Sequence, residues 1–371
     1  MKPLLPFLFI AVSLSINAQG LKEANELIEN FQFEKALQVL VQLNDSTDIH
    51  IPLQSGYCYS RLGNYKSAIE NYKQALQIDS LNRISLNQLG QIYSRTNQYA
   101  LAEDCYKKLI YIDSLNSFYF KQYAALAAST NYDSLAAMLY FKTLKLNPRD
   151  IESYSSLGNI LLEGENYYQL DSLIGRALFV DSLQSSILLL KAKSELAQHK
   201  YKKVIVTVKK ILEWNDTQPI HARLLGISYF QLNEYAKVVE CMNYLLLSGV
   251  KSEWVYYYLG ASYRELNDLP KSIDAMSKAI EGGISENIGV YYSQLAKAYE
   301  ESKDYKNAIH YYQAAYEKSK TKILLYHLAR NYDVYFKDKS SAIAYYKRYL
   351  ASDDTIKLAR EYSRRRLDVL E

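Results

Sequence analysis

Two stretches of the chain, IPLQSGYCYSRLGNYKSAIENYKQALQIDS (residues 51–80) and RISLNQLGQIYSRTNQYALAEDCYKKLIYIDS (residues 83–114), repeat one another. Aligning them matches residues 34 positions apart: Gly56 with Gly90, Tyr59 with Tyr93, Tyr65 with Tyr99, Ala68 with Ala102, Tyr72 with Tyr106 and Ser80 with Ser114. A fixed period of this length indicates a stacked repeat, in which no single unit buries its own apolar face.

The same register continues along nearly the whole chain. The positions equivalent to Ala68 hold mostly small or branched residues: Ala36, Ala68, Ala102, Ala136, Leu170, Val204, Val238, Ser272, Ala308 and Ala342. The gaps between them are 34 residues, except the first gap of 32 and the eighth of 36. This register predicts about ten repeats over residues 19–354.

Within each repeat the pattern predicts two helices joined by a turn. Leu86, Leu89 and Tyr93 are spaced three and four residues apart, so they form one apolar helix face. Gly90 lies on that face, although glycine costs a helix about 1 kcal/mol relative to alanine. We therefore expect this position to lie where the two helices of a repeat approach closely.

The period and the placement of small and aromatic residues resemble the tetratricopeptide repeat, a helix–turn–helix unit. The resemblance implies an all-α fold, a right-handed superhelical solenoid of about ten helix–turn–helix repeats. Pro148 stands where this family usually has proline, whereas Ser80, Ser114 and Ser182 replace it elsewhere.

After the last repeat, residues 355–371 carry apolar side chains on one side, which predicts a C-terminal capping helix. Arg364, Arg365 and Arg366 are expected to form a solvated face at its end.

Two regions depart from the regular pattern. Repeats five and six replace its alanine and aromatic residues with Leu170, Ile174, Val204 and Val208. Residues 281–287, which include two consecutive glycines, add two residues between repeats eight and nine. We interpret this insertion as a looser joint within one solenoid.

The N-terminus, MKPLLPFLFIAVSLSINAQG (residues 1–20), has the features of a secretory signal. Lys2 precedes an apolar run that is too short to span a bilayer, and Ala18 offers a small residue for cleavage. A buried first helix is the alternative, which Pro3 and Pro6 disfavour. We therefore predict a signal peptide at residues 1–18 and export to the periplasm or cell envelope.

The composition argues against several classes of function. The net charge of +4 is small and evenly spread, so neither nucleic acid nor an anionic membrane is an expected partner. No other long apolar segment predicts a transmembrane anchor. Cys58, Cys105 and Cys241 follow no metal or redox spacing, and we expect all three to be buried and inert.

No catalytic motif, metal-ligand spacing or cofactor fingerprint occurs in the sequence. The five histidines, His50, His199, His221, His310 and His327, are scattered among different repeats. The sequence therefore predicts a non-catalytic protein without metal or cofactor.

Proteins that resemble this family bind extended peptides or partner helices in a concave groove lined by the first helices. With Tyr59, Tyr93 and Tyr263 placed in the core, the flanking positions turn toward that groove. The predicted partner-binding residues are Tyr57, Arg61, Asn87, Gln91, Arg95, Lys121, Arg223, Trp254, Tyr257, Arg264, Lys297 and Arg330. Their cations, amides and aromatic rings suit peptide carbonyls and acidic side chains.

A second hypothesis is that the protein binds glycans such as peptidoglycan. The chain has 37 tyrosines, most of which we assign to the core. Tyr256, Tyr257 and Tyr258 are consecutive, so they cannot all face inward from one helix. Together with Trp254, their exposed parts would form the sugar-binding surface.

Overall fold

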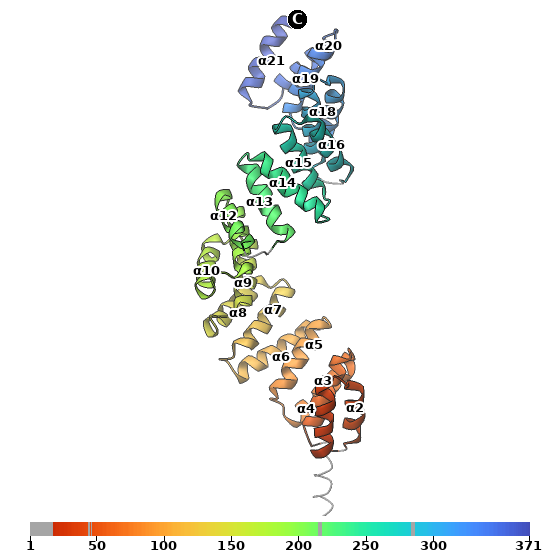
Figure 1. The fold of residues 1–371 in the computed structure, drawn as a ribbon, viewed down its shortest axis with the longest axis vertical. Helices are drawn as coiled ribbons and strands as arrows, with labels where there is room; N and C mark the ends of the chain where they lie inside the picture. The colour runs from red at the N-terminus through yellow and green to blue at the C-terminus, as the bar shows by residue number, and fades with distance from the viewer. Residues whose placement is uncertain (1–17, 44, 46, 214–216, 283–285) are drawn as a thin grey trace, which may run out of the picture. The chain divides into compact units, whose positions relative to one another are not determined.

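The computed structural model describes residues 18–43, 45, 47–213, 217–282 and 286–371 (Figure 1). Within these residues the regular structure is entirely α-helical. The chain divides into two compact units, residues 1–182 and 183–371. The division falls between repeats five and six, the repeats in which the sequence pattern is weakest.

In the first unit, helical residues 18–29 precede nine further helices. These are α2 (Phe33–Gln42), α3 (His50–Arg61), α4 (Tyr65–Ile78), α5 (Arg83–Arg95), α6 (Tyr99–Ile112), α7 (Ser117–Ser129), α8 (Asp133–Leu146), α9 (Ile151–Glu163) and α10 (Tyr167–Val180).

The second unit contains the remaining helices. These are α11 (Ser185–Ala197), α12 (Tyr201–Leu212), α13 (Pro219–Gln231), α14 (Tyr235–Leu247), α15 (Glu253–Glu265), α16 (Leu269–Glu281), α17 (Ile288–Glu301), α18 (Tyr305–Ser319), α19 (Ile323–Tyr335), α20 (Ser340–Leu350) and α21 (Lys357–Leu370).

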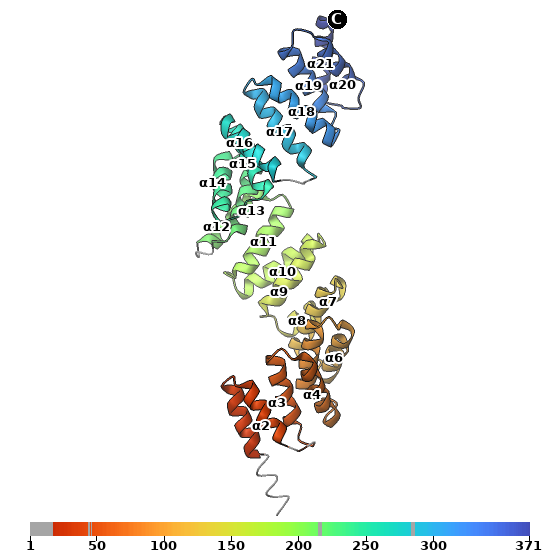
Figure 2. The ribbon, with the colours of Figure 1, turned by 90° about the vertical axis from the view of Figure 1, so that its right-hand side faces the viewer.

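Consecutive helices pair in an antiparallel arrangement within each unit, as Figures 1 and 2 show. The odd-numbered helices from α3 to α19 are the first helices of the repeats, and the even-numbered ones are the second. Each second helix packs both on its own first helix and, within a unit, on the first helix of the following repeat. The predicted all-α solenoid of helix–turn–helix repeats is confirmed.

The repeated glycine of the first helix lies directly against a side chain of the second helix. A methyl group added to Gly90 would lie 2.9 Å from the ring of Tyr106, and one added to Gly56 would lie 3.0 Å from Tyr72. Tyr72 is 1% exposed and Tyr106 is 2% exposed. The missing side chain therefore makes room for a buried tyrosine, which explains why the sequence tolerates glycine inside a helix.

Every turn between a first and a second helix, up to the ninth repeat, contains one residue in the left-handed region. These residues are Phe31, Gly63, Asn97, Asn131, Glu165, His199, Asn233, Asn267 and Lys303. Their spacing follows the repeat register, including its gaps of 32 and 36. Glycine and asparagine adopt this conformation most easily, so the other residue types hold it at a cost in free energy.

The capping helix α21 packs on α20 and α19. Its Leu367 joins a buried cluster with Ala329 and Tyr346, so it covers the apolar side of the tenth repeat. The Arg360 guanidinium donates hydrogen bonds to the carbonyl oxygens of Leu350 (2.8 Å), Ser352 (3.1 Å) and Asp354 (3.0 Å). It thereby satisfies carbonyl groups at the C-terminal end of α20.

Two expectations about individual residues are wrong. Arg366 does not belong to a solvated face, because its Nε donates to the buried carboxylate of Asp333 on α19 at 2.6 Å. Cys58 and Cys105 are buried, but Cys241 is only partly buried.

Candidate partner-binding face

All twelve predicted partner-binding residues lie on first helices. Tyr57 and Arg61 lie on α3; Asn87, Gln91 and Arg95 on α5; Lys121 on α7; Arg223 on α13; Trp254, Tyr257 and Arg264 on α15; Lys297 on α17; and Arg330 on α19. They belong to two separate sets, one in each unit, and each set is described by itself.

In the first unit, four predicted residues line one pocket between α3 and α5. Tyr57, Arg61, Gln91 and Arg95 enclose a volume of about 320 Å³, together with Tyr65 at the start of α4. The Arg61 guanidinium lies 5.9 Å from the ring centre of Phe33. Within the described residues neither arginine has a carboxylate within ion-pair distance. The pocket therefore offers cationic and amide donors to a ligand that carries acceptors.

This face continues onto α7. Gln91 and Arg95 also line a neighbouring pocket of about 400 Å³, whose other wall includes Gln122 and Ser129. Asn87 lies elsewhere on α5 and is partly buried, and no described residue donates a hydrogen bond to its Oδ1. The structure thus brings the predicted residues of α3 and α5 into one polar surface and leaves Asn87 outside both pockets.

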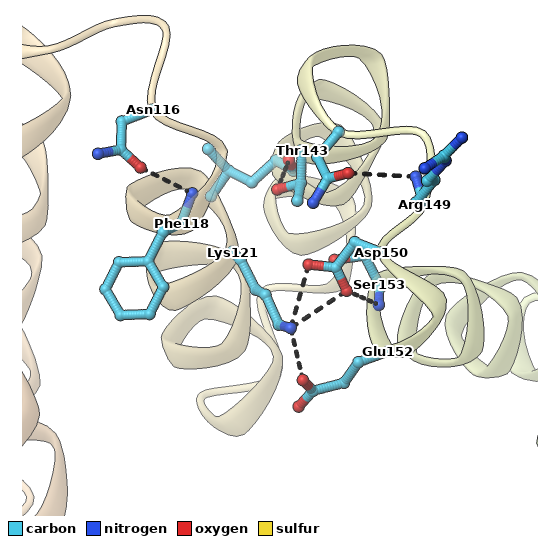
Figure 3. A network of polar contacts seen from close by, with 10 residues as sticks. Asn116, Phe118, Lys121, Thr143, Arg149, Asp150, Glu152 and Ser153 are labelled. Atoms are coloured by element: carbon cyan, nitrogen blue, oxygen red, sulfur yellow. Dashed lines mark hydrogen bonds and ion pairs between the residues drawn. The ribbon is translucent and has the colours of Figure 1, made fainter.

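Lys121 occupies a different environment, as Figure 3 shows. Its Nζ lies 3.1 Å from Asp150 and 2.5 Å from Glu152, both at the start of α9. Asp150 also accepts a hydrogen bond from the backbone N–H of Ser153 and so caps α9. Burial alone would lower the pKa of Lys121, but its hydrogen bonds to Glu152 and Asp150 raise it. Lys121 therefore links two consecutive first helices inside the chain.

In the second unit, the two predicted aromatic residues, Trp254 and Tyr257, are each packed against neighbouring side chains. The Arg223 guanidinium lies 5.1 Å from the centre of the Trp254 ring. The rings of Trp254 and Tyr258 are roughly perpendicular, with their centres 6.3 Å apart. The ring centres of Tyr257 and of Tyr291 on α17 are 5.3 Å apart. Much of the aromatic surface is thus used between adjacent first helices.

Arg264 is held by neighbouring carboxylates. Its side chain is only 8% exposed and donates to Glu301 at 3.1 Å and to Glu265 at 2.5 Å. It joins α15 to α17 within the second unit, as Lys121 joins α7 to α9 in the first.

Lys297 and Arg330 line one pocket of about 370 Å³ between α17 and α19. Arg330 lies 3.6 Å from Glu300, which also accepts a hydrogen bond from the Tyr312 hydroxyl at 2.7 Å. Burial alone would raise the pKa of Glu300, but the His327 imidazole 3.8 Å away, the hydrogen bond from Tyr312 and the positive charge of Arg330 lower it to about 2. Glu300 therefore stays ionised beside Arg330.

The sequence did not single out several residues that line these pockets: Tyr65, Gln122, Glu300, Glu301, Tyr305, His327 and Asn331. Glu300 and Glu301 follow Lys297 by three and four residues, which places them next to it on the same helix surface. That spacing could have identified both carboxylates. Tyr65 and Tyr305 come from second helices, so a rule restricted to first helices could not find them.

Other chemistry is limited in the part of the chain that the structure describes. No group of three His, Cys, Asp or Glu side chains there is placed to hold a metal ion. Burial raises the pKa of each cysteine thiol to about 11, so these thiols are protonated at neutral pH. None of the described helices combines the length and apolarity needed to cross a bilayer.

Two family models of the tetratricopeptide repeat match the sequence, at residues 48–112 and 290–317. The first match covers α3 to α6, which include the helices around Arg61 and Arg95, and the second lies within α17 and α18. The chain contains tetratricopeptide repeats. No curated protein matches the chain in sequence.

Solved structures to which the chain is similar include a tetratricopeptide repeat protein from Parabacteroides merdae ATCC 43184. It is 18% identical, covers 67% of this chain and 98% of its own, and gives a TM-score of 0.50. PilF of Pseudomonas aeruginosa is 15% identical over 57% of this chain and 97% of its own, with a TM-score of 0.46. MamA from Desulfovibrio magneticus RS-1 is 14% identical over 46% of this chain and 97% of its own, with a TM-score of 0.42. At 18% identity, the structure from Parabacteroides merdae supports the fold of this chain and indicates nothing about its function.

Proposed function

We propose that this tetratricopeptide repeat protein is a non-catalytic scaffold that binds an extended segment of a partner protein along its first helices. We further propose that it acts outside the cytoplasm, in a periplasmic or cell-envelope assembly. The observation that carries the first part is the pocket between α3 and α5. There, Arg61, Gln91 and Arg95 present donors that the described part of the chain does not pair with carboxylates.

The chemistry of this pocket suits a peptide. Arginine and glutamine can donate several hydrogen bonds each, and a peptide backbone supplies carbonyl acceptors at regular intervals. Tyr57 is 38% exposed beside them and provides an aromatic surface for an apolar side chain. Tetratricopeptide repeat proteins commonly bind protein partners, which agrees with this use of the face.

Site-specific photocrosslinking tests the proposal. A benzophenone amino acid placed at Tyr57 should crosslink a specific protein in the cells that make this chain. The matched control places the same amino acid at Tyr111, which is 89% exposed on the second helix α6. The variant R61Q/R95Q should lose the crosslink at position 57. Equal crosslinking at both positions, or none at Tyr57, would contradict binding at this pocket.

The location rests on the N-terminal sequence, of which residues 1–17 lie outside the described residues. The sequence predicts cleavage after Ala18. Protein purified from its own cells should therefore begin at Gln19 when its N-terminus is sequenced. A mature protein that retains Met1 or Lys2 would refute export by this signal.

Glycan binding is the second candidate, favoured by the cluster of Trp254, Tyr257 and Tyr258 on α15. It is weaker because these rings already contact Arg223, Tyr291 and one another. Titrating soluble peptidoglycan fragments should change tryptophan fluorescence in the wild type and not in Trp254→Phe, which retains only Trp214. An identical response in both proteins would exclude a site at Trp254.

A further inference from the structure

The pocket between α17 and α19 contains a buried acceptor with no donor. Asn331 lines this pocket and is 1% exposed. Its Nδ2 donates to the carbonyl oxygen of His327 at 2.8 Å, whereas its Oδ1 has no hydrogen-bond partner among the residues that the structure describes. A buried acceptor without a donor costs about 1–3 kcal/mol of folding free energy, so Asn331 destabilises the fold unless a ligand supplies the donor.

The same pocket contains a cation without an ion-pair partner. Lys297 is exposed at the pocket, and no described carboxylate lies within ion-pair distance of it. The carboxylates beside it are already engaged: Glu300 by Arg330 and the Tyr312 hydroxyl, and Glu301 by Arg264. Because these two carboxylates are already paired, the unpaired charge among the described residues of this pocket is that of Lys297, which favours an anionic ligand.

Arg330 can bind a second carboxylate in addition to Glu300. Its side chain is 41% exposed, and Glu300 is the only described carboxylate paired with it, at 3.6 Å. Its guanidinium lies 5.6 Å from the ring centre of Tyr326 and 5.9 Å from that of Tyr362. The two rings hold the guanidinium beside the pocket while leaving several of its N–H groups for hydrogen bonds.

We propose that this pocket binds an aspartate or glutamate side chain of the partner segment. The carboxylate pairs with Lys297 and Arg330, and a backbone N–H of the same segment donates to Asn331 Oδ1. The inference rests on the proposed function, since it specifies the chemistry of one position along the first helices.

A side chain within the segment is favoured over a free C-terminus. Contacts link α15 with α17 and α19 with α21, so the pocket lies in the middle of a row of helices. A segment that follows this row passes the pocket with an internal residue.

Peptide selection on the immobilised full-length protein tests the proposal. The probe is a library of nine-residue peptides with amidated C-termini, in which the central residue is Glu, Asp, Gln or Asn and the flanks are random. Wild type should retain Glu and Asp peptides preferentially. Lys297→Gln should bind the selected peptides about tenfold more weakly, because it removes a charge-assisted hydrogen bond. The matched control Lys306→Gln, an exposed lysine on α18, should bind them like wild type.

Asn331→Leu separates a binding role from a structural one. If Asn331 serves the ligand, the leucine variant should lose affinity for the selected peptides while melting at the same or a higher temperature than wild type. A lower melting temperature with unchanged affinity would assign Asn331 to the core and overturn its part in the site.

Further outcomes would overturn the inference. One is retention of peptides without preference for an acidic centre, or a preference that survives Lys297→Gln. Another is preference for a second library that lacks acidic residues and has a free C-terminal carboxylate. If no peptide is retained although Tyr57 crosslinks a partner, this pocket fails while the proposed function stands. Failure of both experiments would remove both.

Discussion

The second and third repeats (α3–α6) and the ninth and tenth repeats (α17–α20) have cores built in the same way but present different chemistry to a ligand. Both bury a tyrosine on each second helix: Tyr72 and Tyr106 in one, Tyr312 and Tyr346 in the other. In the register, however, Ser60 and Ser94 correspond to Glu300, and Arg61 and Arg95 correspond to Glu301. The repeat therefore fixes where a side chain lies, and the residues that vary between repeats decide which charge it has.

The largest expected effect concerns the core. Gly90→Leu should lower the free energy of unfolding by about 3 kcal/mol or more, because its new side chain must enter the contact with Tyr106. Lys108→Leu, on the exposed side of α6, should change it by less than about 0.5 kcal/mol. Urea denaturation of both variants measures the difference. Equal destabilisation would show that the register, and with it the comparison, is wrong.

The next largest effect concerns Glu300, a partly buried charge that the second and third repeats lack. Glu300→Gln should cost about 2 kcal/mol at pH 7, because Arg330 and the Tyr312 hydroxyl lose an ionised partner. The folded-state pKa of Glu300 is lowered from 4.5 to about 2, so its ionised form stabilises the fold above pH 4.5. The advantage of wild type should therefore disappear as the pH falls from 4.5 to about 2. Denaturation at pH 7, 4 and 2.5 tests this, and a difference that does not depend on pH would refute it.

A matched pair of arginine substitutions gives a smaller effect. Arg330→Gln should destabilise the protein by about 1 kcal/mol, since it leaves Glu300 without its cation. Arg95→Gln should stay within about 0.5 kcal/mol of wild type, because no described carboxylate pairs with Arg95. Thermal melts of both variants suffice. A larger loss for Arg95→Gln would mean that its role is structural and would weaken the proposed binding pocket.

The smallest effect concerns the turns. Gly63 of the second repeat has φ +75°, and Lys303 of the ninth has φ 66°. Lys303→Gly should stabilise the protein by about 0.5–1 kcal/mol, and Gly63→Lys should destabilise it by a similar amount. No heavy atom lies within 4 Å of a methyl group added at Gly63, so the expected cost is in the backbone alone. Changes of the same sign in both variants would contradict this explanation.

The fold could be predicted from the sequence because the same pattern of small and apolar residues recurs in successive repeats. A period of 34 residues around Ala68 and Ala102 determined the pairing of helices, and both alanines are fully buried. It also predicted the capping helix. The capping helix begins at Lys357 instead of the expected residue 355.

The pairing of charges could not be predicted in the same way. Lys121 meets Asp150, 29 residues away, and Arg366 meets Asp333, 33 residues away. Such contacts depend on how one repeat stacks on the next and on which way a long side chain turns. Neither is determined by the pattern within a single repeat. A cation on a first helix can therefore be paired internally, as Lys121 is, or have no carboxylate partner in the described part of the chain, as is the case for Lys297.

The hydrogen bonds of Arg360 have a consequence for how such an array can lengthen in evolution. Arg360 bonds to the carbonyl oxygens of Leu350, Ser352 and Asp354, and α21 covers the apolar surface where another first helix would pack. A duplicated repeat inserted after Asp354 would have to displace α21 and then offer it an equivalent surface. A duplication that begins and ends at equivalent positions of internal repeats meets no such obstacle, since each new interface copies an existing one. Gain or loss of repeats should therefore be tolerated within the array more readily than at this end.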